Sequence, residues 1–210
     1  MKSFGVLLCI VPALAAPSNT LHGGLTNELQ LQEGLPANYS IGEMQWRGFE
    51  DFDEGQVFTG TIQDVIHQMK QIKGNDYTPR FVSEAKAEAA NPGKNATHSY
   101  HTDMEIISCG GDGANPSRIE DGVNYLHKIA LDAICNIAPK TCSRVSCSWK
   151  SGIWLCNDID DTVGVICNTL GDYAAKVLSE CTINDSVPRV SGTDRNDERG
   201  YSVKVGHANC

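Results

Sequence analysis

The stretch that decides the fold is Thr141-Cys142-Ser143-Arg144-Val145-Ser146-Cys147-Ser148-Trp149-Lys150-Ser151-Gly152-Ile153-Trp154-Leu155-Cys156. Val145, Cys147 and Trp149 alternate with polar residues, a pattern that predicts a strand with one apolar face. The polar run 150–152 predicts a turn, and Ile153–Cys156 returns as the hairpin partner. The C-terminal half of this 210-residue chain is therefore expected to contain an antiparallel hairpin that carries cysteines.

A helix is predicted on each side of this hairpin, from apolar residues that recur at spacings of three and four. Ser117 and Glu120 form a capping-box pattern at the start of the first helix, and Pro139 ends it. The acidic run 157–161 is expected to open the second helix, where the helix dipole favours carboxylates. The two stripes are Ile119, Val123, Leu126, Ala130 and Ala133, and Val163, Ile166, Leu170, Ala174, Val177 and Cys181.

The remaining elements of this half are an opening and a closing strand. The apolar run 104–108 predicts a strand that leads into a loop over 109–116, and Tyr201, Val203 and Val205 alternate in a last strand. Residues 182–200 are polar and are expected to be loop. The order predicts an α+β fold, a two-layer α/β sandwich in which two helices cover one face of an antiparallel sheet. Cys135 and Cys167 would then lie on the two helices and could staple them.

The first residues, MKSFGVLLCIVPALAA, have the features of a secretory signal. Lys2 precedes an apolar core, and the small residues at 13–15 fit a cleavage site. A membrane anchor is the alternative, but the apolar run is shorter than the roughly 20 residues that span a bilayer. We expect residues 1–15 to be a signal peptide and the protein to be secreted, with no membrane span.

Eight cysteines remain after Cys9 is removed with this signal, and all of them follow residue 108. An even number in one half of an exported chain predicts four disulfides. A zinc site is the alternative, but only Cys142 and Cys147 have a suitable spacing. Eight cysteines allow about 105 pairings, so spacing does not establish the connectivity. The eight are Cys109, Cys135, Cys142, Cys147, Cys156, Cys167, Cys181 and Cys210.

Residues 16–102 have no cysteine after the signal and little periodic pattern, so we expect a weakly structured N-terminal extension. One amphipathic helix is predicted over 61–73, with Thr61 as its cap and Asp64 in the capping-box position. Residues 84–100 have the composition of a linker. The extension either docks on the cysteine-rich domain, residues 103–210, or is a pro-segment.

Charge and sequons describe the surface of the protein. A net charge of −9 argues against nucleic-acid binding, because phosphate contacts need a basic face, and against adsorption to anionic membranes. Asn38, Asn95 and Asn184 lie in glycosylation sequons, which predicts that they are at the surface. We expect a monomer whose partner is a protein or cell-surface component.

Two groups of residues suggest metal binding, and for both we favour another interpretation. His98 and His101 have no third fixed ligand, so a polar linker is preferred to a metal site. Asp158, Asp160 and Asp161 lack the glycine and distal glutamate of an EF-hand calcium loop, so helix capping is preferred. We therefore expect neither a metal nor a cofactor.

A secreted ribonuclease-like hydrolase is the enzyme hypothesis, with His127, His207 and Glu120 as acid and base. Nothing in the sequence brings these three residues together, and His127 is expected at a solvated helix position. Cysteine nucleophiles are not expected if all eight cysteines pair. No serine-hydrolase, phosphate-loop or zinc-protease motif is present. We predict that the protein is not an enzyme.

The hairpin supplies the candidate partner-binding residues. Trp149 and Trp154 flank the predicted turn with Lys150 between them, and Arg144 lies earlier in the hairpin. Aromatic residues beside a cation are common at contact surfaces. We expect at least one of the two tryptophans to cover the helices as core and the other to contact a partner.

Residues 104–210 resemble the fungal KP4 killer toxin family and its secreted relatives. The resemblance rests on ordered landmarks: Ile107-Ser108-Cys109, Cys135, Thr141-Cys142, Arg144-Val145-Ser146-Cys147, Val165-Ile166-Cys167-Asn168-Thr169-Leu170, Ser179-Glu180-Cys181, and Gly200 to Val205 with the terminal Cys210. It implies the disulfides Cys109–Cys181, Cys135–Cys167, Cys142–Cys156 and Cys147–Cys210.

The resemblance also implies a secreted, non-enzymatic protein that acts by binding, either a killer toxin or an effector directed at a host in virulence. The killer toxins are basic and rely on a lysine just before the hairpin cysteine. This chain is acidic and has Arg144 and Val145 in that region. These departures argue against calcium-channel block. A structural or protective extracellular factor is the alternative among binding proteins.

Overall fold

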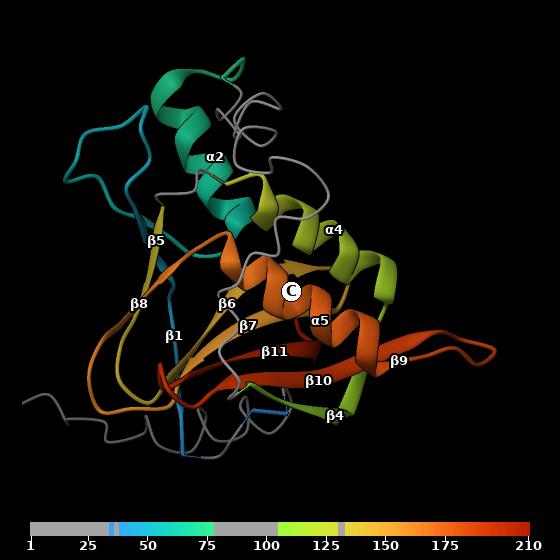
Figure 1. Ribbon diagram of the computed structural model, residues 1–210. Helices are drawn as coiled ribbons and strands as arrows, with labels where there is room; N and C mark the ends of the chain where they lie inside the picture. Colours follow the sequence, from blue (N-terminus) through green and yellow to red (C-terminus); the bar gives the residue numbers. More distant parts are fainter. Residues whose placement is uncertain (1–33, 36–37, 78–104, 130–132) are drawn as a thin grey trace, which may run out of the picture.

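The computed structural model describes residues 34–35, 38–77, 105–129 and 133–210. These residues form an α+β fold with two sheets and three helices (Figure 1). None of the described helices is both long and apolar enough to cross a membrane. The helices are α2 (Ile62–Lys73), α4 (Pro116–His127) and α5 (Thr169–Cys181).

The larger sheet has the strand order β1-β6-β7-β11-β10-β4, and β9 also pairs with β10. All its pairs are antiparallel except the parallel pair between β1 and β6. The strands are β1 (Ser40–Gly42), β4 (Glu105–Ala114), β6 (Thr141–Ser148), β7 (Ser151–Asn157), β9 (Thr182–Ile183), β10 (Arg189–Asn196) and β11 (Tyr201–His207).

The predicted hairpin is β6 and β7, and its turn is one position earlier than the sequence suggests. Ser148 pairs with Ser151, so Trp149 and Lys150 alone form the loop. Their φ angles are 48° and 59°. Two positive φ angles are typical of the type I′ turn, whose twist matches that of the strands.

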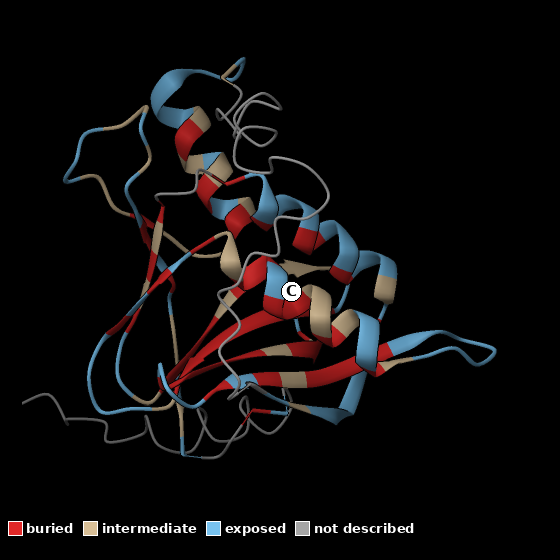
Figure 2. Ribbon diagram, viewed as in Figure 1, coloured by how far each residue is buried: buried red, intermediate tan, exposed pale blue. Residues whose placement is uncertain are grey.

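All three helices lie on one face of the larger sheet, and their buried stripes meet the inward residues of its strands (Figures 1 and 2). Alternation along the strands explains this face, because successive side chains point to opposite sides. Ile153 and Leu155 on β7, with Val203 and Val205 on β11, belong to this core. The prediction of helices on one face of a sheet is thus confirmed, with α2 added to the two helices expected.

The opposite face of the larger sheet has a smaller cluster. Trp154, Cys142, Cys156 and Ala208 pack there beneath Leu35. Trp154 is therefore buried on the face away from the helices, and it does not cover them.

A second sheet has the order β3-β2-β5-β8 and joins the N-terminal segment to the cysteine-rich region. Trp46 on β2 is fully buried and lies opposite Cys135 on β5. The capping box of α2 is formed as predicted, with Thr61 and Asp64 bonded reciprocally. Residues of this segment thus share one core with residues 105–210. The strands are β2 (Gln45–Arg47), β3 (Phe58–Thr59), β5 (Ile134–Ile137) and β8 (Val163–Ile166).

Four disulfides cross-link the cysteine-rich region, and they are the same four pairs that the resemblance implies. Cys142–Cys156 joins registered neighbours across the hairpin, and Cys147–Cys210 fastens the end of the chain to β6. Cys109–Cys181 joins β4 to the last residue of α5, and Cys135–Cys167 joins β5 to the segment before α5. Cross-links over loops of this length stabilise a domain by about 3–4 kcal/mol each, chiefly by restricting the unfolded chain.

The two helices predicted for the cysteine-rich region are shorter in the structure than the sequence suggests. Some of the apolar residues that were expected to extend them lie in short strands. The first helix ends at His127, and the run 134–137, which lies within the predicted helix, forms β5. The second begins at Thr169, and Val163 and Ile166 lie on β8. Pairing between β5 and β8 decides both segments. Cys135 and Cys167 therefore do not lie on helices.

The predicted loops on either side of these helices are also partly wrong. The run 109–114 continues β4, and Asn115 caps α4 in place of Ser117. Residues 189–196 form β10, a strand hidden from sequence patterning because polar residues dominate it. Its position between β11 and β4 supplies hydrogen bonds on both edges. A Cβ on Gly192 would lie 2.7 Å from the Cys181 sulfur, so the strand needs glycine there.

Several predictions lie outside the described residues. They are the signal peptide 1–15, the linker 84–100, the sequon at Asn95 and the histidines His98 and His101.

The N-terminal segment is expected to contribute directly to stability through Trp46. Its indole Nε1 donates to the carbonyl of Gly60 at 2.8 Å, and the ring is fully buried. Trp46→Ala should lower the free energy of unfolding by about 3–5 kcal/mol in denaturant titrations with the disulfides intact. Arg47→Ala, on the exposed side of the same strand, is the control and should change it by less than about 0.5 kcal/mol. Equal stabilities of the two variants would contradict this role.

A second prediction concerns high pH. Burial, the hydrogen bond to Asp158 and the charge of that carboxylate raise the pKa of Tyr39 from 10.0 to about 12. The Tyr39 hydroxyl donates to Asp158 Oδ1 at 2.6 Å. A raised phenol pKa favours the folded state below pH 10, and this stabilisation is lost as pH rises from 10 to 12.

Tyr39→Phe tests this directly. The tyrosinate absorbance titration of the variant should lack one group that ionises near pH 12 in the parent. The stability difference between parent and variant should be constant below pH 10 and shrink above it. A Tyr39 that titrates with the exposed tyrosines would overturn this assignment.

Candidate functional site

The turn of the hairpin presents a large aromatic side chain to solvent. Trp149 is 77% exposed, and its backbone φ of 48° is in the left-handed region. Lys150, the other residue of the turn, is exposed and has φ 59°. Bulky residues rarely take this conformation, which costs of order 1–3 kcal/mol per residue. An exposed tryptophan with a costly backbone conformation does not stabilise the fold. Its presence in the turn therefore indicates a role other than stability.

Arg118 on α4 holds one side of this tryptophan. Its guanidinium lies 5.6 Å from the centre of the Trp149 ring, which is a cation–π distance. Asn115 caps the helix just before it by accepting from the Ser117 amide. Arg118 also pairs with Asp121 at 3.2 Å. The exposed ring thus has a cation–π neighbour on α4 that is itself held by an ion pair within the helix.

A hollow of about 440 Å³ opens beside this tryptophan. It lies between α4, the first turn of α2 and the end of β6. A Cβ on Gly122 would lie 2.9 Å from both Ile153 Cδ1 and Ser146 Oγ, so glycine allows α4 to lie close to the sheet here. The lining residues are Gln63, Arg118, Asp121, Gly122, Asn124, Tyr125, Lys128 and Ser148.

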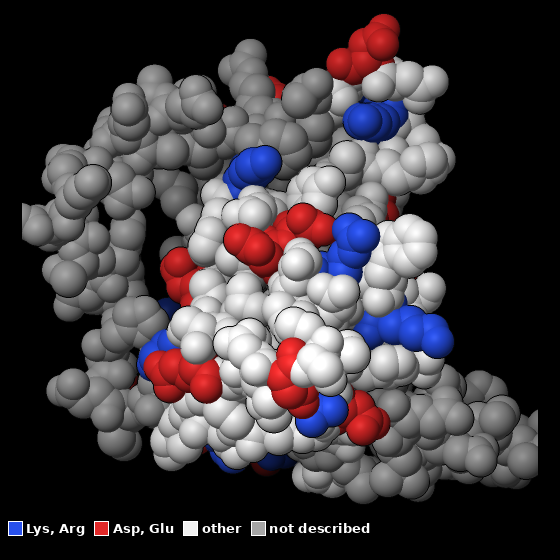
Figure 3. Space-filling model, turned by 90° about the vertical axis from the view of Figure 1, so that its right-hand side faces the viewer, with Lys and Arg blue, Asp and Glu red and all other residues white. Residues whose placement is uncertain are grey.

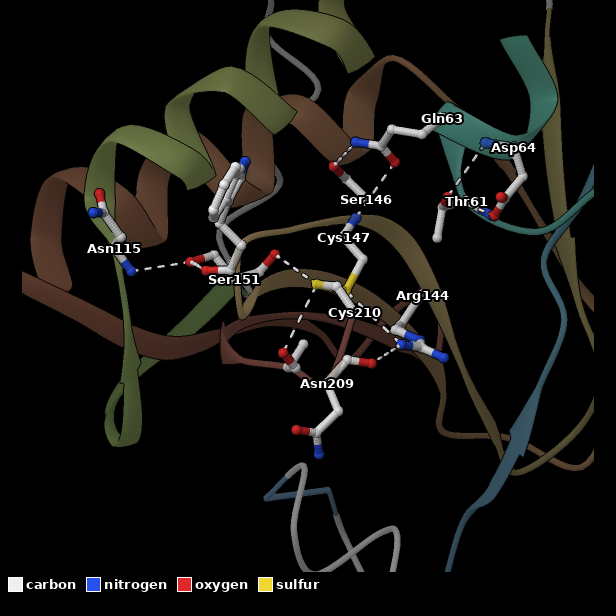
Figure 4. Close-up of a disulfide and its surroundings, with 12 residues drawn as sticks. Thr61, Gln63, Asp64, Asn115, Arg144, Ser146, Cys147, Ser151, Asn209 and Cys210 are labelled. Carbon is white, nitrogen blue, oxygen red and sulfur yellow. Dashed lines mark hydrogen bonds between the residues drawn. A yellow bond between two sulfur atoms is a disulfide. The ribbon is translucent and has the colours of Figure 1, made fainter. Parts of the chain in front are cut away.

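Gln63 connects α2 to the hairpin at one end of the hollow (Figure 4). Its amide Nε2 donates to Ser146 Oγ at 3.0 Å, and its Oε1 accepts from the Cys147 amide at 3.4 Å. Cys147 is bonded to Cys210. The wall that Gln63 forms is therefore tied to a disulfide, and the hollow is bounded by fixed elements on this side.

Both signs of charge surround the hollow. Arg118 and Lys128 lie with Asp121 on one stripe of α4, at spacings of three and seven. Figure 3 shows the molecule from the side of α4 and β9 in Figure 1, and acidic and basic side chains intermix over the described surface. The hollow is therefore polar without a strong net charge.

The four hairpin residues predicted to contact a partner differ in their environment. Trp149 and Lys150 are exposed together at the tip, whereas Trp154 is 1% exposed. Arg144 is half-buried, with its guanidinium 5.5 Å from the Trp154 ring centre and donating to the Asn209 carbonyl. Trp154 is the buried tryptophan, but it lies on the face away from the helices that it was expected to cover, and a partner contact by Trp149 stays a prediction. Trp154 is too buried to contact a partner, whereas Arg144 keeps part of its surface exposed and stays a candidate contact.

The histidines proposed for a hydrolase do not converge. His127 is exposed and lies 3.0 Å from Asp172 on α5. Within the described part of the chain, neither Glu120 nor His207 hydrogen-bonds to it, and none of the three lines the hollow. His127 acts as a link between α4 and α5 in this arrangement.

The aspartates after the hairpin do not cap a helix, because a strand follows them. Asp158 accepts from Tyr39 and pairs with Arg195 at 3.4 Å, and Asp160 is 3.8 Å from Lys140. The described residues contain no group of three or more side chains suited to hold a metal ion. Asn38 and Asn184 are exposed, as surface sequons require.

Sequence reasoning missed all the residues that line the hollow, because the predicted contacts Arg144, Trp149, Lys150 and Trp154 are not among them. Arg118, Asp121 and Tyr125 recur at spacings of three and four, but a polar stripe of this kind is usually a solvated helix face. The one local signal is Tyr125, a large aromatic residue outside the apolar stripe, which is 42% exposed.

Tryptophan fluorescence provides a test of this geometry, because the chain has three tryptophans and only Trp149 is exposed. Iodide should quench one component of the emission strongly and leave the emission of Trp46 and Trp154 almost unchanged. Trp149→Phe should remove the quenched component. Quenching that persists in Trp149→Phe would place another tryptophan at the surface.

No protein-family model matches this chain, and neither a curated protein nor a solved structure matches it. The geometry of the hairpin tip and the hollow therefore has to carry the functional interpretation.

Proposed function

We propose that this is a secreted, non-enzymatic binding protein of the KP4-like kind, which contacts a cell-surface or extracellular target through the hairpin tip and α4. The observation that carries the proposal is Trp149, exposed at 77% on a backbone with φ 48°. Partner contacts are often dominated by a few tryptophan, tyrosine and arginine side chains. Trp149, Tyr125 and Arg118 gather these three types on one surface.

Strain supports this interpretation of the tip. Asparagine and glycine are the residues that a two-residue turn with positive φ favours. Trp149 and Lys150 occupy those positions, and their positive φ angles lower the stability of the folded protein. Residues held in costly conformations tend to cluster at functional sites, because selection for a contact offsets the loss.

The cross-links support an extracellular role. Four disulfides fit an oxidising compartment. Their pairing is the one implied by the resemblance to the KP4 killer toxins, which supports that family as the origin of the domain. The net charge of −9 and the structural use of Arg144 favour a target other than the calcium channels that the basic toxins block.

Binding is favoured over the two alternatives by what surrounds the hollow. A hydrolase would need an acid and a base aimed into a cleft, and His127 pairs with Asp172 outside it. A purely structural or protective factor gives no reason to retain a strained, exposed tryptophan.

A double variant tests the proposal without destabilising the protein. Trp149→Asn combined with Lys150→Gly installs the favoured turn residues, so stability should be unchanged or higher. The relief of backbone strain, about 1 kcal/mol or more per residue, offsets the lost cation–π contact of about 0.5–1 kcal/mol. Binding of the labelled protein to intact fungal and plant cells, measured by flow cytometry, should fall at least tenfold.

Arg189→Ala is the matched control for this experiment. Arg189 is an exposed arginine on β10 in an ion pair with Asp185, and it does not line the hollow. Its removal should leave cell binding unchanged, whereas Arg118→Ala should weaken it. Equal binding by the parent and the turn variant, or no binding of the parent to either cell type, would refute the proposal.

A further inference from the structure

We infer that the hollow beside Trp149 binds an uncharged carbohydrate, such as a segment of a cell-surface polysaccharide. The inference rests on the proposed function and names the chemical class of its target. It is carried by the exposed indole ring of Trp149, whose neighbour Arg118 lines a hollow of about 440 Å³ together with acidic, amide and hydroxyl side chains. This volume is within the usual range of small-molecule sites.

The lining can both donate and accept hydrogen bonds. The carboxylate of Asp121 accepts, the guanidinium of Arg118 and the ammonium of Lys128 donate, and the amides of Asn124 and Gln63 do both. Each sugar hydroxyl is also a donor and an acceptor. A ligand with many hydroxyls can therefore pair with lining groups of both kinds, and the lining has no large aliphatic side chain.

Trp149 supplies the apolar contact that a sugar ring requires. Its ring meets Arg118 at 5.6 Å, and the 77% exposure of the residue leaves most of its surface open to a ligand. An aromatic face is electron-rich, so it attracts the C–H groups on the flat side of a pyranose. Tyr125, 42% exposed, adds a second aromatic surface with a phenol that can hydrogen-bond.

Other ligand classes fit these features less well. A protein partner would insert large apolar or aromatic anchors into desolvated pockets, and most of the side chains that line this hollow are charged or carry an amide or hydroxyl group. A nucleic acid needs a basic surface, and the chain carries a net charge of −9. A strongly charged small ligand would meet charge of its own sign, since Arg118 and Lys128 lie with Asp121.

Co-sedimentation with insoluble polysaccharides tests the inference. The probes are chitin, cellulose, β-1,3-glucan, xylan and mannan, each incubated with the full secreted protein. The parent should sediment with at least one of them, and the soluble oligosaccharide of that polymer should release it. The same oligosaccharide should shift the fluorescence of the parent and not that of Trp149→Phe.

Two variants locate the site. Trp149→Asn with Lys150→Gly, and Asp121→Ala, should each weaken sedimentation at least tenfold, whereas Arg189→Ala should bind as the parent does. Asp121 is exposed, so its removal should not unfold the protein. Sedimentation that survives both variants would place the carbohydrate elsewhere and overturn the inference.

Treatment of the target cells separates this inference from the proposed function. Digestion of the cells with a mixture of chitinase, cellulase, β-1,3-glucanase, xylanase and mannanase should abolish cell binding, and proteinase K should not. Binding that resists the glycosidases but is lost after proteinase K, with no sedimentation on any polymer, refutes the carbohydrate and retains the binding function. Absence of both cell binding and sedimentation refutes both.

Discussion

The rest of the structure depends on the burial of β7 on both of its faces. Each of its seven residues is buried, and its neighbours β6 and β11 saturate both of its edges. Ile153 and Leu155 face the helices, while Trp154 and Cys156 face the other way. A strand buried on both sides requires cover on both sides. The helices cover one face of β7, and Leu35 packs against the opposite face.

Close approach between layers then positions the candidate site. Gly122 lets α4 lie against the sheet, and Gly192 lets β10 pass beside the sulfur of Cys181. The proximity of α4 to the end of β6 creates the hollow, and Gln63 ties α2 to the same place. The N-terminal segment thus takes part in both the core and the wall of the site. A sharp separation between an extension and a cysteine-rich domain does not describe this packing.

The chemistry of the tip follows from the rigidity below it. The disulfide Cys142–Cys156 joins the two strands of the hairpin far from the turn. The disulfide Cys147–Cys210 ties the strand next to the turn to the C-terminal residue. A braced two-residue turn can hold Trp149 in a conformation that a free loop would relax. Arg118 orients the ring from the side of α4. For the binding function proposed above, side chains ordered before a ligand arrives would lower the entropic cost of binding.

Local sequence determined the elements whose signals do not depend on distant partners. The β6–β7 hairpin follows from the alternation before its turn and the apolar run 153–156 after it, and α2 follows from its stripe and the Thr61–Asp64 capping box. The cores of α4 and α5 follow from their apolar stripes in the same way. An even number of cysteines indicated four cross-links, although the resemblance, and not the spacing, supplied their pairing.

Tertiary structure alone decided the remaining elements and the hollow. The residues of β5 and β8 have apolar spacing that also fits a helix. They form strands because each segment supplies the backbone hydrogen bonds of the other. β10 is polar and becomes a strand only between two neighbours. Trp149 and Trp154 are equivalent in the sequence, yet one is exposed and the other is buried beneath Leu35. Arg118, Gln63 and Ser148 come from three separate elements, and local pattern contains no information about their meeting, because packing between layers brings them together.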